Sequence, residues 1–232
     1  MIVAILQARA GVPDLPDRAL APLRGQPLIW RQVERIRMAR SVDRVIVATS
    51  TRPVDDPLAT LLISRGQAVF RDDSEHRFMR CVEAAGGAEI VVRLKADSPF
   101  IDPALIDEAV ATARSTRAAY VSNIREPTYP KGLEVEAASA HALGRAASGM
   151  DAEAAAESSP MRWLRTRPAP FPQETIRAPR NWSEMDWRVR TPADLAFARG
   201  VYDAMHDADP GFGVQTVLAL LGGRQDLARW AA

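Results

Sequence analysis

The chain has 232 residues, 47% of them hydrophobic and 25% charged, which is the composition of an ordinary globular protein. With 30 basic and 29 acidic residues the formal net charge is +1, so no basic surplus drives binding to nucleic acid. One cysteine excludes an internal disulfide and a cysteine-built metal site, and no apolar run reaches the 18 residues of a membrane span. We therefore expect a cytoplasmic protein with small-molecule partners, without nucleic acid or membrane among them.

Short apolar runs alternate with helical patterns over the first 123 residues. Strands are predicted at 2–6, 42–50, 68–70, 89–94 and 118–123. Helices are predicted at 28–40, 56–66, 75–85 and 102–115, and later in the chain at 191–208 and 213–223. The alternation of strands with helices predicts an α/β sandwich built on a mostly parallel sheet.

Several helix ends carry their own sequence signals. Gly66 is suited to close one helix, because glycine adopts the left-handed backbone conformation at helix ends without strain. Asp102 before Pro103 and Thr191 before Pro192 are each suited to begin one, with the first residue as N-cap and proline in the first turn.

The second half of the chain is less regular. Residues 132–147 predict a short strand followed by a helix, and the small, acidic stretch 148–160 is weakly helical at most. Four prolines exclude regular helix from residues 165–182, so we expect an extended excursion there, either an edge strand or a dimer arm. We take residues 1–232 as a single domain.

Ligands of parallel α/β sheets bind beyond the carboxyl ends of the strands. The loop that follows the first strand, QARAGVPDLPDRAL, holds Arg9, Gly11 and Arg18. Glycine lets backbone amides approach a ligand closely, and arginines pair with phosphate oxygens through two hydrogen bonds. The alternative is that these arginines are solvated and that Gly11 only forms a turn.

A second candidate site follows the fourth predicted strand. Asp97 is well placed there to hold a Mg²⁺ ion that bridges nucleotide phosphates, and Lys95 adds positive charge. The alternative is that Asp97 caps a turn, because Asp-Ser-Pro is a common turn sequence.

Two further stretches carry polar residues. Glu134 and Glu136 alternate, so on one strand they would share a face and bind a sugar hydroxyl or a metal; an exposed strand edge is the alternative. Asp186 and Arg190 flank a short strand whose Trp187 we assign to the core.

Taken together and in order, several motifs resemble the CMP-sugar synthetase-like cytidylyltransferases, and among them the spore-coat polysaccharide type. The motifs are QARAGVPDLPDRAL, GQPLI, VIVATSTRPVDDPLA, VFRDDSEHRFMR, VVRLKADSPFIDP, YVSN, GLEVEA and WRVRTPADLAFAR. The resemblance covers roughly residues 2–205 and implies the nucleotide-diphospho-sugar transferase fold. That fold is a Rossmann-like, three-layer α/β/α sandwich with a mostly parallel mixed sheet, often in a homodimer.

The resemblance also implies an activity, the transfer of CMP from CTP to an acidic or phosphorylated sugar-like acceptor, with Mg²⁺ as cofactor. Such a reaction releases pyrophosphate and serves surface polysaccharide or glycan biosynthesis. The implied catalytic residues are Arg9, Arg18 and the metal ligand Asp97. The implied nucleotide-binding residues are Gln7, Ala8, Gly11, Thr49, Ser50, Arg71, Arg80 and Lys95. The implied substrate-binding residues are Ser122, Asn123, Glu134, Glu136 and Arg190.

The sequence departs from the family pattern where triphosphate and metal are handled. The first loop of the family reads roughly Q-A-R-x-G-S-T-R-L-P-x-K, whereas this chain has Val12, Pro13 and Asp14 for Ser-Thr-Arg and Arg18 for the lysine. Asp14 would repel a triphosphate if the loop keeps the family's path.

The other departures lie further along the chain. Lys95 and Ala96 stand for Thr-Gly, Arg190 stands for the second metal-binding Asp, and residues 156–160 stand for R-E-H-V-T. Three hypotheses follow: an active cytidylyltransferase, a catalytically degenerate member that binds nucleotide or sugar or regulates a partner, and a related group transfer such as glycosyl transfer.

Overall fold

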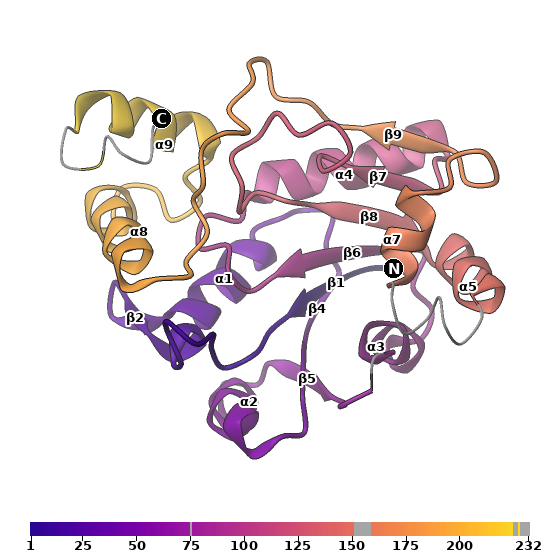
Figure 1. Cartoon of the computed structure of the whole chain (residues 1–232), viewed down its shortest axis with the longest axis horizontal. Coiled ribbons are helices and arrows are strands. Elements are labelled where there is room, and N and C mark those ends of the chain that lie inside the picture. The colour runs from indigo at the N-terminus through magenta and orange to yellow at the C-terminus, as the bar shows by residue number, and fades with distance from the viewer. Residues whose placement is uncertain (75, 151–158, 225–226, 228–232) are drawn as a thin grey trace.

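In the computed structural model, which describes residues 1–74, 76–150, 159–224 and 227, one sheet spans both halves of the chain (Figure 1). Its seven described strands lie in the order β5-β4-β1-β6-β8-β7-β9. They are β1 (Ile2–Gln7), β4 (Arg44–Thr49), β5 (Ala68–Arg71), β6 (Ile90–Lys95), β7 (Tyr120–Ser122), β8 (Glu136–Ser139) and β9 (Gln173–Thr175). β8 is antiparallel to β6 and β7, and the other neighbouring pairs are parallel. The predicted mostly parallel mixed sheet is confirmed.

Helices cover both faces of this sheet and complete three layers. The described helices are α1 (Leu28–Arg37), α2 (Asp56–Ser64), α3 (Arg77–Ala85), α4 (Pro103–Thr116), α5 (Ala140–Gly149), α7 (Pro160–Arg165), α8 (Pro192–Met205) and α9 (Val214–Gly223). Apolar residues of α1, α4 and α8 pack in one core cluster, and those of α3, α5 and α7 in another. Successive residues of β1 alternate between the two clusters, because side chains of a strand point to opposite faces.

Local sequence signals set the helix ends as expected. The Asp102 carboxylate accepts a hydrogen bond from Ala104 N at 3.0 Å at the start of α4. Thr191 and Asp194 form a reciprocal capping box at the start of α8. Gly66 follows α2 with a φ of +70°, the left-handed conformation that glycine adopts most easily. A short hairpin of β2 (Pro22–Leu23) and β3 (Gln26–Pro27) is an addition to the predicted elements.

Part of the proline-rich segment forms an edge strand, while its first residue ends α7 and residues 168–170 form a turn. β9 pairs in parallel with β7, and Ile176 N continues the pairing to Ser122 O at 3.0 Å. The expectation of an edge strand is confirmed, and a dimer arm stays a prediction. The weak helix expected over 148–160 lies largely at 151–158, outside the described residues. Among the described residues, no helix is both long and apolar enough to cross a bilayer.

Cys81 provides a test of the core beneath α3. Its side chain is fully buried, and burial raises the pKa of the thiol to about 12, because the charged thiolate is poorly solvated there. At pH 8 only about one thiol in 10,000 is then ionised. We expect folded protein to resist alkylation by iodoacetamide at pH 8, with reactivity rising only toward pH 12 or on unfolding in urea. Rapid labelling of the folded protein at pH 8, followed by mass spectrometry, would contradict this packing.

Candidate active site

A pocket opens where two neighbouring parallel strands end. β1 and β6 are paired in register, so their carboxyl ends meet at the same edge of the sheet. A cavity of about 540 Å³ lies there, lined by the loop after β1, the end of β6, Arg18 and Arg77. The lining includes seven of the predicted site residues, namely Gln7, Ala8, Arg9, Gly11, Arg18, Lys95 and Asp97.

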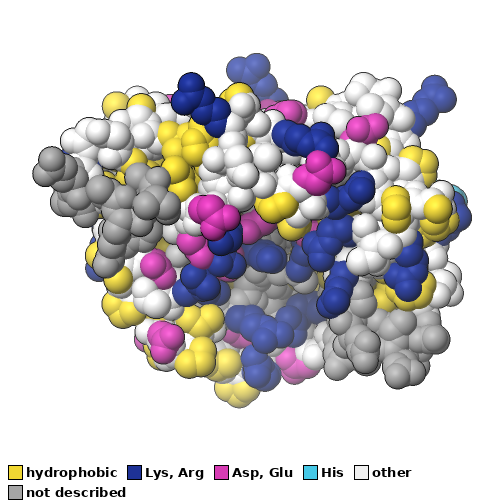
Figure 2. All heavy atoms as spheres, turned by 45° about the horizontal axis from the view of Figure 1, so that its top comes forward, with side chains coloured by type: hydrophobic (Ala, Val, Ile, Leu, Met, Phe, Trp, Pro, Cys, Tyr) yellow, Lys and Arg dark blue, Asp and Glu magenta, His cyan; other side chains and the backbone are white. Residues whose placement is uncertain are grey.

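The pocket is strongly basic. Its described lining carries one carboxylate, Asp97, against five basic side chains, which are Arg9, Arg18, Arg77, Arg93 and Lys95. Lys and Arg side chains also gather around a hollow on the face of the molecule seen in Figure 2. A concave site with one sign of charge concentrates ligands of the other sign, so this pocket favours a polyanion such as a triphosphate.

Arg18 lines this pocket and has a buried hydrogen-bond donor without a partner among the described residues. The residue is 9% exposed, and its Nη1 donates to Val189 O at 3.3 Å. Its Nε is buried and has no hydrogen-bond partner among the described residues. Burial lowers the pKa of Arg18, while the negative charge of Asp97 acts in the opposite direction. Because an unpaired buried donor costs about 1–3 kcal/mol, a phosphate oxygen at Nε would relieve that cost.

A buried carboxylate fixes the path of the first loop. Asp55 is fully buried and accepts hydrogen bonds from Ala10 N at 2.6 Å and from the Ser50 hydroxyl. Gly11, which follows Ala10, packs so closely against the backbone of Pro16 that an added Cβ would lie 1.6 Å from Pro16 O. Glycine is therefore required here by close approach of the backbone, rather than by a positive φ.

The two residues that most strongly opposed nucleotide binding in the sequence lie outside this pocket. Asp14 is exposed and does not belong to the lining. Arg190 is also absent from the lining, and its Nη2 lies 2.8 Å from Asp186 Oδ2. Burial disfavours the charged form of Asp186, but hydrogen bonds from Arg188 and the charges of both arginines bring its pKa below the usual range.

Asp97 is the candidate metal ligand, and its carboxylate interacts with one hydroxyl group and two arginines. Its Oδ1 accepts a hydrogen bond from Ser98 Oγ at 3.2 Å, and its charge interacts with Arg18 and Arg188. The described part of the chain contains no cluster of three His, Cys, Asp or Glu residues that could hold a metal. A Mg²⁺ ion at Asp97 would therefore take its other ligands from water and substrate phosphates, as Mg²⁺ often does.

The other predicted nucleotide residues, at the ends of β4 and β5 and on α3, are not in the lining of the pocket. Thr49 is buried, and its hydroxyl has no partner among the described residues. Ser50 binds Asp55, as noted above, and Arg71 Nε donates to Ser50 O at 2.9 Å. Arg80 forms an ion pair with Asp72. These contacts make residues 49–72 a support for the first loop.

The predicted sugar residues are engaged within the protein. The Asn123 amide donates to Leu133 O at 2.7 Å and accepts from Val135 N at 2.9 Å. Ser122 is buried, and its hydroxyl accepts from Ile124 N at 3.4 Å. These side chains hold the loop that leads into β8.

The expectation that two glutamates share one strand is wrong. β8 begins at Glu136, so Glu134 precedes the strand, where it accepts a hydrogen bond from Gly132 N at 3.0 Å. Glu136 itself is 2% exposed and forms an ion pair with Arg93. The strand starts late because Asn123, rather than strand pairing, holds the preceding backbone.

Two basic residues of the pocket, Arg93 and Arg77, were not predicted from the sequence. Arg93 and Lys95 are two positions apart on β6, so the alternation of side chains on a strand already pointed to a shared face. Arg77 begins α3, and only the packing of that helix beside β1 brings its side chain to the pocket. No local pattern marks such a residue.

Known proteins resemble this chain in sequence. The family model described as cytidylyltransferase matches residues 3–203. The spore coat polysaccharide biosynthesis protein SpsF of Bacillus subtilis (strain 168) is 26% identical over 236 residues, 98% of this chain and 96% of that protein. The 3-deoxy-manno-octulosonate cytidylyltransferase of Geobacter sulfurreducens is 39% identical over 114 residues, 47% of this chain and 44% of that protein.

Solved structures share the fold. A cytidylyltransferase from Leptospira borgpetersenii serovar Hardjo-bovis (strain JB197) matches with a TM-score of 0.87 and 18% identity, over 97% of this chain and 95% of that one. The synthetase of CMP:2-keto-3-deoxy-manno-octonic acid, complexed with CTP, matches with a TM-score of 0.62 and 18% identity, over 88% and 98% of the two chains. The expected nucleotide-diphospho-sugar transferase fold is confirmed.

The role of Asp55 generates a stability prediction. Replacement of Asp55 by Ala leaves Ala10 N buried without an acceptor, so we expect the free energy of unfolding to fall by about 1–3 kcal/mol. Its neighbour Asp56, whose side chain is 54% exposed in its pair with Arg71, provides the control. Asp56→Ala should cost less than about 1 kcal/mol. Urea unfolding of both variants measures the difference, and equal losses would show that Asp55 does not fix the loop.

Proposed function

The chain belongs to the cytidylyltransferase family, and on that premise we propose that it transfers CMP from CTP to an acidic or phosphorylated sugar-like acceptor. The observation that carries the proposal is the basic pocket at the ends of β1 and β6, whose lining residue Arg18 has a buried Nε without a partner among the described residues. The acceptor class follows the named substrate of the 3-deoxy-manno-octulosonate enzyme, a sugar acid. The B. subtilis relative, named for spore coat polysaccharide biosynthesis, supports a role in making a surface glycan.

In the proposed reaction an acceptor oxygen attacks the α-phosphorus of CTP in line with the leaving group. A new bond forms between that oxygen and phosphorus, the bond to the bridging oxygen breaks, and its electron pair leaves with pyrophosphate. Where the attacking oxygen belongs to a hydroxyl group, its proton passes to solvent. Arg9, Arg18 and Arg77 hold the phosphates and stabilise the charge that develops on pyrophosphate. Positioning and electrostatics therefore supply most of the rate.

We also propose one Mg²⁺ ion, held by Asp97 together with the phosphates. The single carboxylate in the lining fits such a site, since Mg²⁺ commonly binds one or two carboxylates and substrate phosphates. When bound, the ion supplies additional positive charge to the triphosphate. Arg188, whose charge interacts with Asp97, remains paired with Asp186.

Two observations favour catalysis over the degenerate alternative, in which the protein only binds nucleotide or sugar or regulates a partner. The acid expected to repel the triphosphate, Asp14, is exposed and outside the lining. Arg190 is neutralised in part by its pair with Asp186, so it does not add an unpaired charge to the pocket.

We further propose a homodimer in which segment 165–182 reaches the partner. Light scattering would test the dimer by measuring the mass of the protein in solution.

The proposed activity generates an assay of pyrophosphate release. CTP is mixed with Mg²⁺ and with either 3-deoxy-manno-octulosonate or a panel of sugar acids and sugar phosphates. We expect release with an acidic acceptor, and we expect Arg18→Ala to reduce kcat/KM about 10²-fold or more, as loss of a transition-state contact does.

The matched control for this assay is Arg114→Ala. Arg114 lies in the last turn of α4 and its side chain is 49% exposed in a pair with Glu89. That variant should keep native activity. Saturable CTP binding without turnover for any acceptor on the panel would favour the degenerate alternative.

A further inference from the structure

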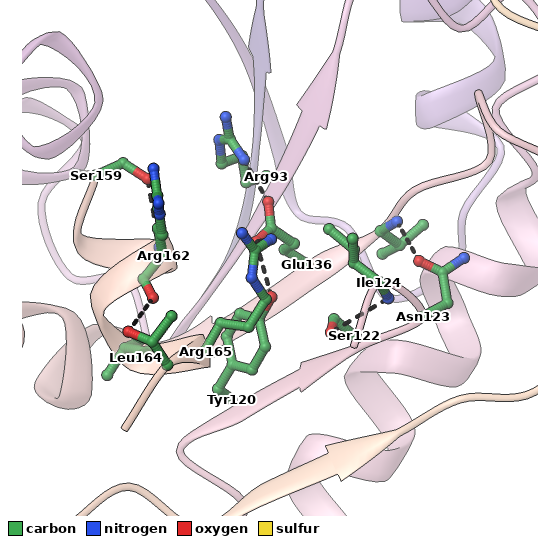
Figure 3. A network of polar contacts seen from close by, with 12 residues as sticks. Arg93, Tyr120, Ser122, Asn123, Ile124, Glu136, Ser159, Arg162, Leu164 and Arg165 are labelled. Carbon is green, nitrogen blue, oxygen red and sulfur yellow. Dashed lines mark hydrogen bonds and ion pairs between the residues drawn. The ribbon is translucent and has the colours of Figure 1, made fainter. Parts of the chain in front are cut away.

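A buried carboxylate beside the pocket is shared between two arginines. Glu136 is 2% exposed, and its Oε2 pairs with Arg93 Nη1. Its Oε1 accepts a hydrogen bond from the Tyr120 hydroxyl at 2.7 Å and lies 3.7 Å from Arg165 Nη1. Figure 3 shows the Arg93 and Arg165 side chains on either side of this carboxylate.

The elements that bring these groups together are distant in sequence. Arg93 and Glu136 are register partners across the antiparallel pair of β6 and β8. Arg165 comes from the end of α7, which packs against α5 on the same side of the sheet as Tyr120. Through Glu136, a helix of the second half is therefore tied to a strand that lines the nucleotide pocket.

The charges in this cluster do not balance. Glu136 provides one negative charge, while Arg93 and Arg165 provide two positive charges. Tyr120 adds none, because burial and the neighbouring carboxylate raise the pKa of its hydroxyl well above the usual value. Gln7 Oε1 accepts from Arg93 Nε and is neutral as well. Among the residues that the structure describes, one cationic group thus remains uncompensated, and a guanidinium is suited to pair with an oxyanion through two hydrogen bonds.

The position of this surplus charge separates it from the phosphate-binding arginines. Arg93 lines the pocket and contacts both Gln7 of β1 and Glu136 of β8, whereas Arg9 and Arg18 come from the loop after β1; Arg165 lies outside the lining. Arg165 is 30% exposed in its side chain and so is accessible to a ligand. An anion held between Arg93 and Arg165 would lie beside the triphosphate rather than in its place.

We propose that Arg93 and Arg165 bind the anionic group of the acceptor, a carboxylate or a phosphate, and that Glu136 is the positioning residue that presents both guanidinium groups. This inference rests on the proposed function, because it names the part of the same site that selects an acidic acceptor. Glu136 does not touch the acceptor. Its buried charge keeps the two arginines close together despite their mutual repulsion, and the hydrogen bond from Tyr120 fixes its orientation.

The first test compares Arg165→Ala with Arg167→Ala. Arg167 lies on the same segment, but its guanidinium packs over the Trp163 ring at 3.3 Å from the centroid and it donates to Thr166. With 3-deoxy-manno-octulosonate and CTP as substrates, we expect Arg165→Ala to raise the KM for the sugar acid at least 10-fold. The dissociation constant for CTP should change less than twofold, and Arg167→Ala should change neither value. Arg165→Lys should recover part of the loss.

Glu136→Gln tests the positioning role separately. It keeps the shape of the side chain but removes the charge that holds the arginines, so the KM for the sugar acid should rise several-fold with little change in CTP affinity. A merely structural role of Glu136 predicts parallel losses in CTP affinity, acceptor KM and stability. That result would overturn its assignment as a positioning residue.

A binding measurement makes the test independent of turnover. Inorganic phosphate and pyruvate are titrated by calorimetry into protein saturated with CTP. The anion that binds with the higher affinity is the preferred one. We expect saturable binding of at least one that Arg165→Ala weakens 10-fold or more and Arg167→Ala does not. Binding of neither anion, or binding that Arg165→Ala leaves unchanged, contradicts the subsite. Failure of the native protein to bind CTP contradicts the proposed function instead.

Discussion

The site depends on the position of one strand, β6, at the boundary between the parallel and antiparallel parts of the sheet. On one edge it pairs with β1, whose loop supplies Arg9 and Arg18, and on the other it pairs with β8, which supplies Glu136. Arg93 and Lys95 emerge from the strand itself. Because backbone hydrogen bonds fix both registers, the loop after β1 and the buried Glu136 are held at set positions on either side of β6.

Buried polar groups then decide which parts of the pocket are fixed and which are left for a ligand. Asp55 and Glu136 are buried carboxylates whose oxygens are occupied by protein donors, so they act on the framework. Arg18 is the opposite case, since its buried Nε lacks a partner among the described residues. The buried carboxylates of Asp55 and Glu136 thus position a loop and the arginines, whereas the basic side chains line the cavity.

Features that depend on neighbouring residues in the chain were predictable from the sequence. The caps at Asp102 and Thr191 involve contacts within three residues, and the loop after β1 follows directly from a buried strand. The place of β8 in the sheet was not predictable, because its pairing with β6 joins residues more than 40 positions apart. For the same reason Glu136 was assigned to substrate rather than to Arg93, and Arg77 was overlooked. Asp14 and Arg190 were given weight in the pocket because the sequence does not show where a loop directs its side chains.

The central claim is that the basic pocket at the ends of β1 and β6 is a CTP site. Calorimetric titration of the purified protein with CTP, with and without Mg²⁺, and with ATP, GTP and UTP for comparison, tests it most directly. We expect saturable binding of CTP that strengthens with Mg²⁺ and exceeds that of the other three nucleotides. Failure to bind any nucleotide, or equal binding of all four, would contradict the assignment of this pocket to CTP.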